Sequence, residues 1–151
     1  MPTYAANKKA HFEYEILEKK EAGLSLLGME VKSVRAGQVK LTGAFVTFHH
    51  TKALLTNAHI GRYRFSSPSL AYDPLRSRTL LLRKKEIDYL RGRTQEDGLT
   101  IVPLSIYTKG RQIKLEIAVC RGKKKFDKRA SIKKRELGRE LSRGIKRGGR
   151  E

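Results

Sequence analysis

Histidine, cysteine and paired carboxylates are the side chains with which this sequence could do catalytic or metal chemistry, and their spacing does not support it. The four histidines (His11, His49, His50, His59) are scattered over separate predicted strands and turns, outside any HExxH or HxE…CxxC frame. An adjacent His pair is more typical of a polar turn than of a metal site. The sequence also has neither a GxxxxGK[ST] phosphate loop nor a GxSxG nucleophile elbow. We therefore expect no enzyme activity, no metal and no cofactor.

Cys120 is the single cysteine of the chain, so it cannot form an internal disulfide or a thiolate zinc cage. Its place at the end of a predicted core strand favours a small buried hydrophobe over a nucleophile. Single-cysteine usage suggests a reducing compartment. No apolar run approaches the ~18 residues of a membrane span, and the N-terminus lacks the apolar stretch of a secretory signal. We expect a cytoplasmic protein that does not enter the membrane.

Lysine and arginine supply the chemistry that the sequence does have. The 151 residues include 34 Lys and Arg against 15 Asp and Glu, a formal net charge of +19, which predicts a polyanionic partner. Nucleic acid is the first choice and an anionic membrane the second. Residues 121–151 hold 14 basic and four acidic side chains, so net +10 lies in this segment and +9 in the first 120 residues. We predict an RNA-binding body, 1–120, and a basic tail, 121–151.

Aromatic residues alternate with cations in two parts of the body, at 8–14 and at Arg62-Tyr63-Arg64-Phe65. Such clusters can stack on bases while they neutralise phosphates, although Tyr63 and Phe65 could equally anchor a loop to the body. A further group of cations surrounds three leucines, Leu80–Leu82, that we expect to face largely inward. This group is a candidate backbone-binding face, formed by Arg76, Arg78, Arg83, Lys84 and Lys85.

The elements that must position these residues are mostly strands. Alternating or apolar runs predict strands at 11–17, 39–41, 44–48, 52–56, 100–107 and 112–119. Pro103 removes a ladder donor, which favours an edge or bulged position. A short helix is predicted over Met29–Ala36, stopped by Gly37, and a second over about 80–91, ended by Gly92 or Gly98. Residues 61–74 are predicted to form an irregular, exposed loop. This pattern indicates a mainly β chain with short helices, best matched by an OB-like small barrel.

The basic tail has the pattern of a marginal helix. Leu137, Leu141 and Ile145 recur every fourth position on an otherwise charged segment. Gly138 and Gly144 would each cost ~1 kcal/mol relative to Ala in a helix interior. We predict that the tail is disordered when free and becomes helical on an RNA-lined surface. An interfacial membrane helix is a weaker interpretation, because the apolar stripe has no aromatic residue.

Six short blocks together resemble the small protein B family of bacteria, the SsrA-binding proteins that bind tmRNA. They appear in order from Glu21 to Arg129: EAGL at 21–24, GMEVKSVRAG at 28–37, NAHI at 57–60, DPLRSR at 73–78, LLLRKKEI at 80–87 and RGKKKFDKR at 121–129. The resemblance covers residues 7 to 135, and its specificity comes from the whole set rather than from any one block.

This resemblance implies an OB-fold body that binds the tRNA-like domain of tmRNA and takes the place of the missing anticodon stem. It implies delivery of tmRNA to a stalled 70S ribosome, with the tail lying in the empty mRNA channel near the small-subunit decoding centre and becoming helical there. Ribosome rescue and tagging of the nascent peptide would follow in trans-translation. Elongation factor Tu and alanyl-tRNA synthetase would be partners only indirectly, through tmRNA, and one monomer would bind each tmRNA.

The resemblance also assigns residues to the two partners. Glu21 matches a family acidic residue needed for tmRNA binding, and Arg83 stands where the family commonly has Asn or His. The residues expected to bind tmRNA are Glu21, Leu81, Arg83, Lys114, Lys32 and Arg35. Those expected to contact the decoding centre and mRNA channel are Phe126, Asp127, Lys128, Arg129, Lys133, Lys134 and Arg135. The main alternative is a ribosomal protein or rRNA-assembly factor with a basic β-barrel, and an RNA-processing enzyme comes third.

Overall fold

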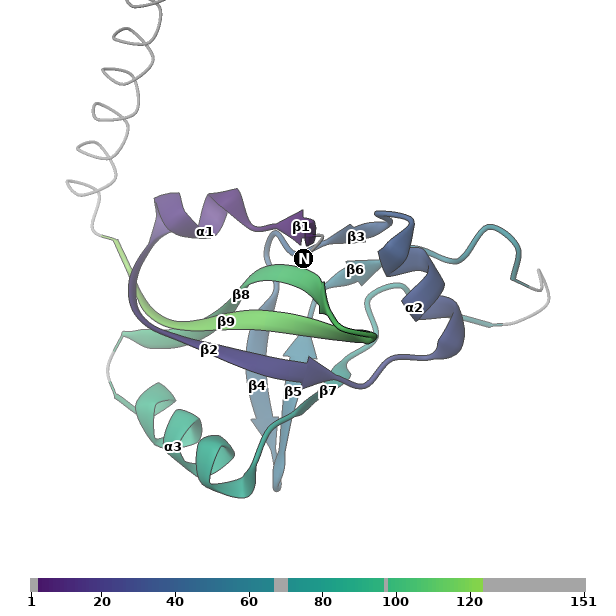
Figure 1. The fold of residues 1–151 in the computed structure, drawn as a ribbon. Helices are drawn as coiled ribbons and strands as arrows, with labels where there is room; N and C mark the ends of the chain where they lie inside the picture. Colours follow the sequence, from purple (N-terminus) through teal and green to yellow (C-terminus); the bar gives the residue numbers. More distant parts are fainter. Residues whose placement is uncertain (1–2, 67–70, 97, 124–151) are drawn as a thin grey trace, which may run out of the picture.

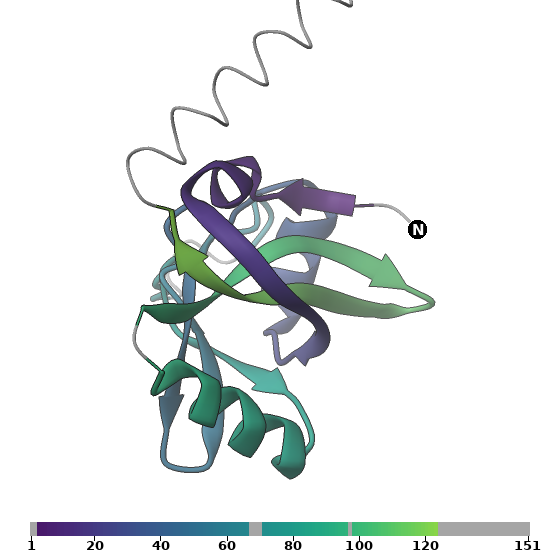
Figure 2. The same ribbon diagram turned by 90° about the vertical axis from the view of Figure 1, so that its left-hand side faces the viewer.

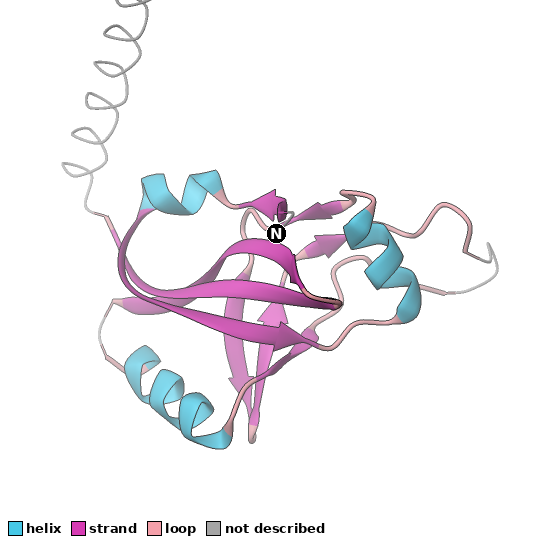
Figure 3. Ribbon diagram, viewed as in Figure 1, coloured by secondary structure: helices cyan, strands magenta, loops and turns pink. Residues whose placement is uncertain are grey.

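The computed structural model describes residues 3–66, 71–96 and 98–123, so the predictions made for the tail from residue 124 onward lie outside the described residues. The elements are β1 (Thr3–Ala6), α1 (Lys8–Glu13), β2 (Tyr14–Leu24), α2 (Gly28–Arg35), β3 (Val39–Lys40), β4 (Phe45–His49), β5 (Lys52–Thr56), β6 (His59–Ile60), β7 (Arg78–Leu81), α3 (Lys84–Thr94), β8 (Leu99–Lys109) and β9 (Gln112–Gly122). The chain is mainly β with short helices, as predicted (Figure 3).

Seven strands form one antiparallel sheet in the order β1-β8-β9-β2-β7-β5-β4, and β3 pairs with β6 in a separate two-stranded sheet. The large sheet is strongly curled, with α1 and α3 at its opposite ends in both views (Figures 1 and 2). Because β1 and β4 end the strand order of the described residues without pairing with each other, the barrel is open rather than closed. β4 nevertheless packs against β8, so the curl encloses the core.

The long hairpin β8–β9 supplies much of this core. Ile113, Leu115, Ile117 and Val119 alternate on the buried face of β9, as the period-2 pattern predicted. The register shift in β8 between Pro103 and Ser105 places Pro103 at a bulge, although β8 is an interior strand between β1 and β9. A bulge is the position in which an interior strand tolerates the missing N–H of proline.

The N-terminal part of the strand predicted over 11–17 is wrong, because Lys8–Glu13 forms helix α1 and the strand begins at Tyr14. Asn7 causes the change. Its side-chain Oδ1 accepts a hydrogen bond from the Ala10 backbone N–H at 3.2 Å, which caps the helix, while its Nδ2 donates to the Pro103 carbonyl at 3.0 Å. The helix turns Ala10 onto a small second core with Val102.

The helix predicted over 80–91 begins later than expected. Leu80 belongs to strand β7, where it pairs with Leu24 and Ala53, and α3 starts only at Lys84. The α3 helix then continues through Gly92 to Thr94, and Gly98, with φ of 77°, lies in the turn that follows. Leu81 is an exception to the expectation that the three leucines face largely inward, because its side chain is 59% exposed.

The helix predicted before Gly37 is confirmed as α2, and Gly37 ends it with φ of 80°, a conformation that suits glycine. The irregular loop predicted over 61–74 is confirmed where the structure describes it. Within the described ranges, no helix is long and apolar enough to cross a membrane.

Candidate RNA-contact surface

One row of residues crosses four neighbouring strands on the outward face of the sheet. Tyr107 of β8 lies opposite Lys114 of β9, Lys114 lies opposite Gly23 of β2, and Gly23 lies opposite Leu81 of β7. Directly opposed residues of antiparallel strands point to the same face. The flanking Ile113 is buried in the core, so the row itself faces outward. The sheet thus brings together residues as far apart in the sequence as Gly23 and Lys114.

Gly23 shapes the centre of this row. A Cβ atom built at Gly23 would lie 3.0 Å from the Leu81 Cβ, so only glycine leaves the Leu81 side chain its present position. Leu81 and Lys114 border a groove of about 420 Å³. Val31 of α2 also lines this groove. The groove therefore combines apolar side chains with two cations, Arg111 and Lys114.

Glu21 lies on β2, two residues before Gly23 and on the same outward face. The Tyr107 hydroxyl donates a short hydrogen bond to Glu21 Oε2, and Lys109 Nζ lies 3.3 Å from Oε1. The Tyr107 hydrogen bond is the main reason that the pKa of Glu21 is lowered. Burial and the hydrogen bond to Glu21 raise the pKa of Tyr107. At neutral pH the surface therefore presents an ionised carboxylate, which can accept further hydrogen bonds.

The other predicted tmRNA-binding residues lie outside this row, on α2 and just before α3. Arg35 Nη2 donates to the Arg111 carbonyl at 3.3 Å, which connects α2 to the β8–β9 turn. Lys32, on the same helix, instead places its ammonium 5.5 Å from the Tyr63 ring centroid. Arg83 is exposed and immediately precedes α3, where its backbone N–H donates to Glu86 Oε1 at 3.3 Å.

The interpretation of Arg78 as a phosphate-binding cation is wrong, and Arg76 joins the same ion-pair network although its side chain is 31% exposed. Both guanidinium groups pair with Glu30 of α2, and Arg78 is fully buried at 0% exposure. Arg78 Nε donates to Glu30 Oε2 at 2.8 Å, and its Nη1 donates to the Ala58 carbonyl at 2.6 Å. A guanidinium with these internal partners and no exposed surface cannot reach an RNA phosphate.

Glu30 has further donors, so its buried charge is well satisfied. The Leu27 N–H donates to its Oε1 at 2.9 Å, and the Tyr72 hydroxyl donates to its Oε2 at 2.9 Å. Burial opposes ionisation, but the hydrogen bonds led by that of Arg76 outweigh it and hold the pKa of Glu30 below its ordinary value. The loop that contains Tyr72 is tied to α2 by this network, so that part of the loop is less exposed than predicted.

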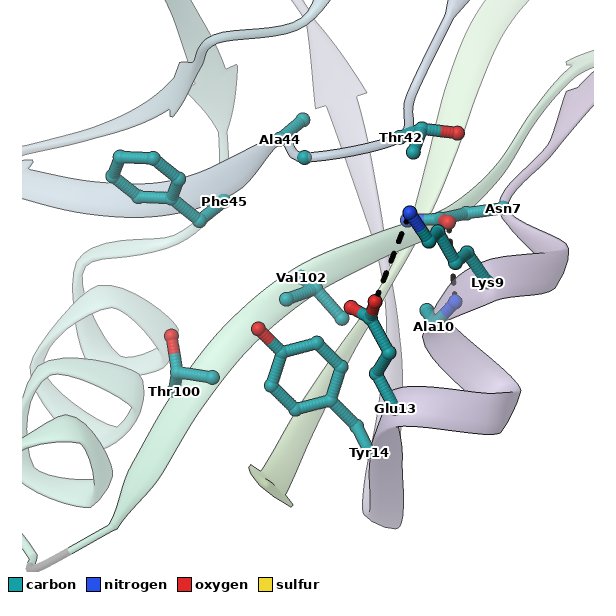
Figure 4. A pocket seen from close by; sticks show the side chains of 11 residues that line it. Asn7, Lys9, Ala10, Glu13, Tyr14, Thr42, Ala44, Phe45, Thr100 and Val102 are labelled. Carbon is teal, nitrogen blue, oxygen red and sulfur yellow. Dashed lines mark hydrogen bonds and ion pairs between the residues drawn. The ribbon is translucent and has the colours of Figure 1, made fainter. Parts of the chain in front are cut away.

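A second concave site lies at the other end of the sheet, between α1, β4 and β8 (Figure 4). It has a volume of about 250 Å³, and Tyr14 and Phe45 face it from different elements. Lys9 and Glu13 form an ion pair of 3.9 Å at its side, and burial raises the pKa of Tyr14. Aromatic residues and a lysine therefore meet here, as the cation-aromatic pattern over 8–14 suggested in part.

The catalytic candidates have ordinary structural surroundings. Cys120 is buried, and burial raises its pKa to about 11, so it is a protonated thiol at neutral pH, as the prediction of a small buried hydrophobe implies. His49 and His50 lie at the turn between β4 and β5, and the positive φ of His50 (55°) is a turn conformation. Among the residues that the structure describes, no three His, Cys, Asp or Glu side chains gather into a possible metal site.

An open, basic β-sheet that presents cations, an ionised carboxylate and an apolar groove on one face is typical of proteins that bind RNA. Residues 4–147 match the family model described as SmpB protein. The chain is 50% identical over 141 residues to an SsrA-binding protein of Gloeobacter violaceus, covering 93% of this chain and 92% of that protein. It is 54% identical over 142 residues to an SsrA-binding protein of Leuconostoc mesenteroides, covering 94% and 92%.

A solved structure described as "tmRNA-SmpB: a journey to the center of the bacterial ribosome" contains a chain that superposes on this one with a TM-score of 0.69 and 40% sequence identity. The superposition covers 87% of this chain and 95% of that chain. The protein belongs to the SmpB family, as the six sequence blocks predicted.

Proposed function

We propose that this protein binds the tRNA-like domain of tmRNA with the outward face of β8, β9, β2 and β7, and acts in trans-translation on stalled ribosomes. One observation carries the proposal: Glu21, Leu81 and Lys114, which the family resemblance assigns to tmRNA, lie together on one exposed face around Gly23. The names of the relatives and of the ribosome complex support the same partner. The protein would act in the cytoplasm, where ribosomes translate.

Each side chain of this face offers RNA a different interaction. Lys114 can pair with a phosphate, which supplies affinity that depends on salt. Leu81, at 59% exposure, offers an apolar contact for a base or a sugar. Glu21 is ionised and can accept hydrogen bonds from a base amino group or a 2′-hydroxyl, which gives the contact selectivity. We assign supporting contacts to Arg35, Lys32 and Arg83, whose side chains remain on the surface.

A second RNA contact is proposed for the tail, residues 121–151, which carries net +10. By resemblance to the family, Phe126, Asp127, Lys128 and Arg129 would contact the small-subunit decoding centre, and Lys133, Lys134 and Arg135 the empty mRNA channel. These residues lie beyond the described part of the chain. The protein itself would catalyse no step. The alanine carried by tmRNA and peptidyl transfer by the ribosome would supply the chemistry of tagging. Elongation factor Tu and alanyl-tRNA synthetase would take part only through tmRNA.

The RNA that copurifies with the full chain tests the proposed partner. We expect tmRNA at about one molecule per protein, concentrated on stalled ribosomes. Ribosomal subunits at unit stoichiometry in growing cells, without tmRNA, would instead indicate a ribosomal protein or assembly factor.

A truncation before Lys123 tests whether the two RNA contacts are separable. We expect the truncated chain to keep tmRNA affinity within a few-fold while tagging on stalled ribosomes is lost, because the tail would act after tmRNA is bound. The Asp127→Ala variant is the matched point substitution, with loss of tagging and unchanged tmRNA affinity. If the truncation lost tmRNA binding outright, the division between body and tail would be refuted.

A further inference from the structure

The segment after β6 and helix α2 together carry a cation-aromatic cluster on the surface. Arg62, Tyr63, Arg64 and Phe65 come from the segment and Lys32 from α2. The Ser66 N–H donates to the Tyr63 carbonyl at 2.9 Å, and the Ser66 hydroxyl donates to the same oxygen at 2.6 Å. These bonds close a turn whose two central residues are Arg64 and Phe65. In Figure 1 the segment that follows β6 extends beyond α2, away from the large sheet. The turn therefore presents Arg64 and Phe65 side by side on the surface.

Phe65 is not the anchor that one reading of the sequence suggested, because it is 74% exposed. Its ring meets the Tyr63 ring edge-on at 5.5 Å, and the Arg64 guanidinium lies 5.1 Å from its centroid. The Lys32 ammonium lies 5.5 Å from the Tyr63 centroid. Two aromatic rings and their cations thus form one surface, whose residues come from the segment after β6 and from α2.

The charges around the cluster favour a phosphate-bearing partner. Residues 57–72 contain no Asp or Glu, and Glu30, the acidic residue of α2, is buried against Arg76 and Arg78. Tyr89 of α3 provides the contrast. It is also exposed, and Lys20 lies 5.4 Å from its ring centroid, but its hydroxyl is bonded to Glu18 and Lys20 pairs with Glu86. Carboxylates would repel phosphate at Tyr89, whereas the sequence around Phe65, residues 57–72, contains none.

We infer that this cluster is a second RNA contact of the body, in which an unpaired base stacks on Phe65 while Arg62, Arg64 and Lys32 neutralise the adjacent phosphates. Stacking on an exposed ring suits any base, because every base has a π-face, and guanidinium groups pair with phosphate oxygens. The inference deepens the proposed function, on which it rests for the choice of RNA over other anions. The contact would involve α2 and the segment after β6, whereas the Glu21 row belongs to β8, β9, β2 and β7.

A stacking probe tests the inference in the full chain. The probe is a 12-nucleotide oligoadenylate with 2-aminopurine at one central position and a fluorescent end label. Anisotropy gives Kd, and the 2-aminopurine signal reports stacking. We expect Phe65→Leu, which keeps an apolar side chain, to weaken binding about tenfold and to change the stacking signal, because base–aromatic stacking contributes on this order. Phe65→Trp should bind at least as tightly as the wild type.

The matched control is Tyr89→Leu, an aromatic-to-leucine change at the carboxylate-surrounded ring, which should leave Kd unchanged within about twofold. The paired Arg62→Gln and Arg64→Gln substitutions should reduce the slope of log Kd against log salt by about 1.4, since each single-strand phosphate contact contributes ~0.7. Phe65→Leu should leave this slope unchanged.

The inference is overturned if Phe65→Leu binds the oligoadenylate as the wild type does, or if Tyr89→Leu weakens binding as much. It is also overturned if Phe65 matters only for binding to phosphatidylglycerol vesicles. Failure here is distinct from failure of the proposed function. Unchanged oligoadenylate binding by Phe65→Leu, with normal tmRNA binding by the wild type, removes the second contact alone, whereas a wild type that does not bind tmRNA removes the proposed partner.

Discussion

Glu21 and Glu30 have the same kinds of partners in very different surroundings. Glu21 receives hydrogen bonds from Tyr107 and Lys109 on an open sheet face, and its side chain is 37% exposed. Glu30 receives hydrogen bonds from a tyrosine and two arginines, and its side chain is 0% exposed. In both cases hydrogen bonds keep the carboxylate ionised. Only the carboxylate of Glu21 can meet a ligand.

Burial therefore distinguishes a structural carboxylate from a binding carboxylate, which the residue type alone does not distinguish. A buried ion pair joins α2 to β7 and to the loop of Tyr72, and removing one member would leave an unpaired charge in the interior. An exposed pair is screened by water and contributes little to folding. We regard the Glu30 network as the support that positions α2, and the Glu21 row as the surface that binds tmRNA.

The largest effect is expected when the buried network is broken. Glu30→Gln removes the charge that compensates Arg78, so we expect the free energy of unfolding to fall by about 3–5 kcal/mol. Urea denaturation followed by circular dichroism measures it. Glu21→Gln is the matched control and should leave the urea midpoint unchanged, because its carboxylate faces solvent. Equal midpoints for the two variants would contradict the division between the two glutamates.

Acid pH should reveal the contribution of the ionised Glu30 carboxylate to folding. The pKa of Glu30 is lower in the folded chain than in the unfolded chain, so its stabilising contribution is present above the unfolded pKa, about 4.3, and is lost as pH falls through the folded pKa. We expect the difference in unfolding free energy between wild type and Glu30→Gln to shrink as the pH falls from the unfolded pKa of Glu30 through its folded pKa. A difference that stayed constant from neutral to acid pH would show that Glu30 is not ionised in the folded protein.

The sequence predicted an element correctly where the signal for that element lies in neighbouring residues. The alternation of β9 and the Gly37 stop of α2 are local signals, and both predictions are confirmed. The run Leu80–Leu82 is equally compatible with a strand and with a helix, so the boundary between β7 and α3 was placed wrongly. The α1 helix was missed because the alternation of β2 continues into it, while its capping depends on a contact of Asn7 with Pro103 across the fold.

The candidate site was predictable only through the family resemblance. Charge counting could not separate Arg78 from Lys114, because the partner of Arg78 lies 48 residues away, on another element. The exposure of Leu81 likewise depends on Gly23 in the neighbouring strand. Both facts come from tertiary pairing, which neither composition nor periodicity contains.

The exposed row should affect binding without affecting folding. Glu21→Gln keeps the size of the side chain and weakens the acceptor, so we expect the Kd for the tRNA-like domain to rise about tenfold, as for loss of a charged hydrogen bond. Tyr107→Phe removes the donor that orients the carboxylate and should have a smaller effect in the same direction. Filter binding at fixed salt measures both. Wild-type affinity for both variants would exclude the Glu21 carboxylate from the contact.

The smallest expected effect concerns a single phosphate contact. Lys114→Gln should raise Kd a few-fold and reduce the slope of log Kd against log salt by about 0.9, the contribution of one duplex phosphate. Lys20→Gln is the control, because Lys20 belongs to β2 but pairs with Glu86 at 3.6 Å. The assignment would be contradicted by a reduced slope for Lys20→Gln together with an unchanged slope for Lys114→Gln. That result would place the phosphate contact at Lys20 instead of Lys114.

Photocrosslinking from the exposed row tests the central claim most directly. With p-benzoylphenylalanine in place of Leu81, we predict a crosslink to the tRNA-like domain of tmRNA that unlabelled tmRNA suppresses. The same group in place of Tyr89, which is also exposed but lies among carboxylates on α3, should give none. A crosslink from position 89 without one from position 81 would contradict the assignment of this sheet face to tmRNA.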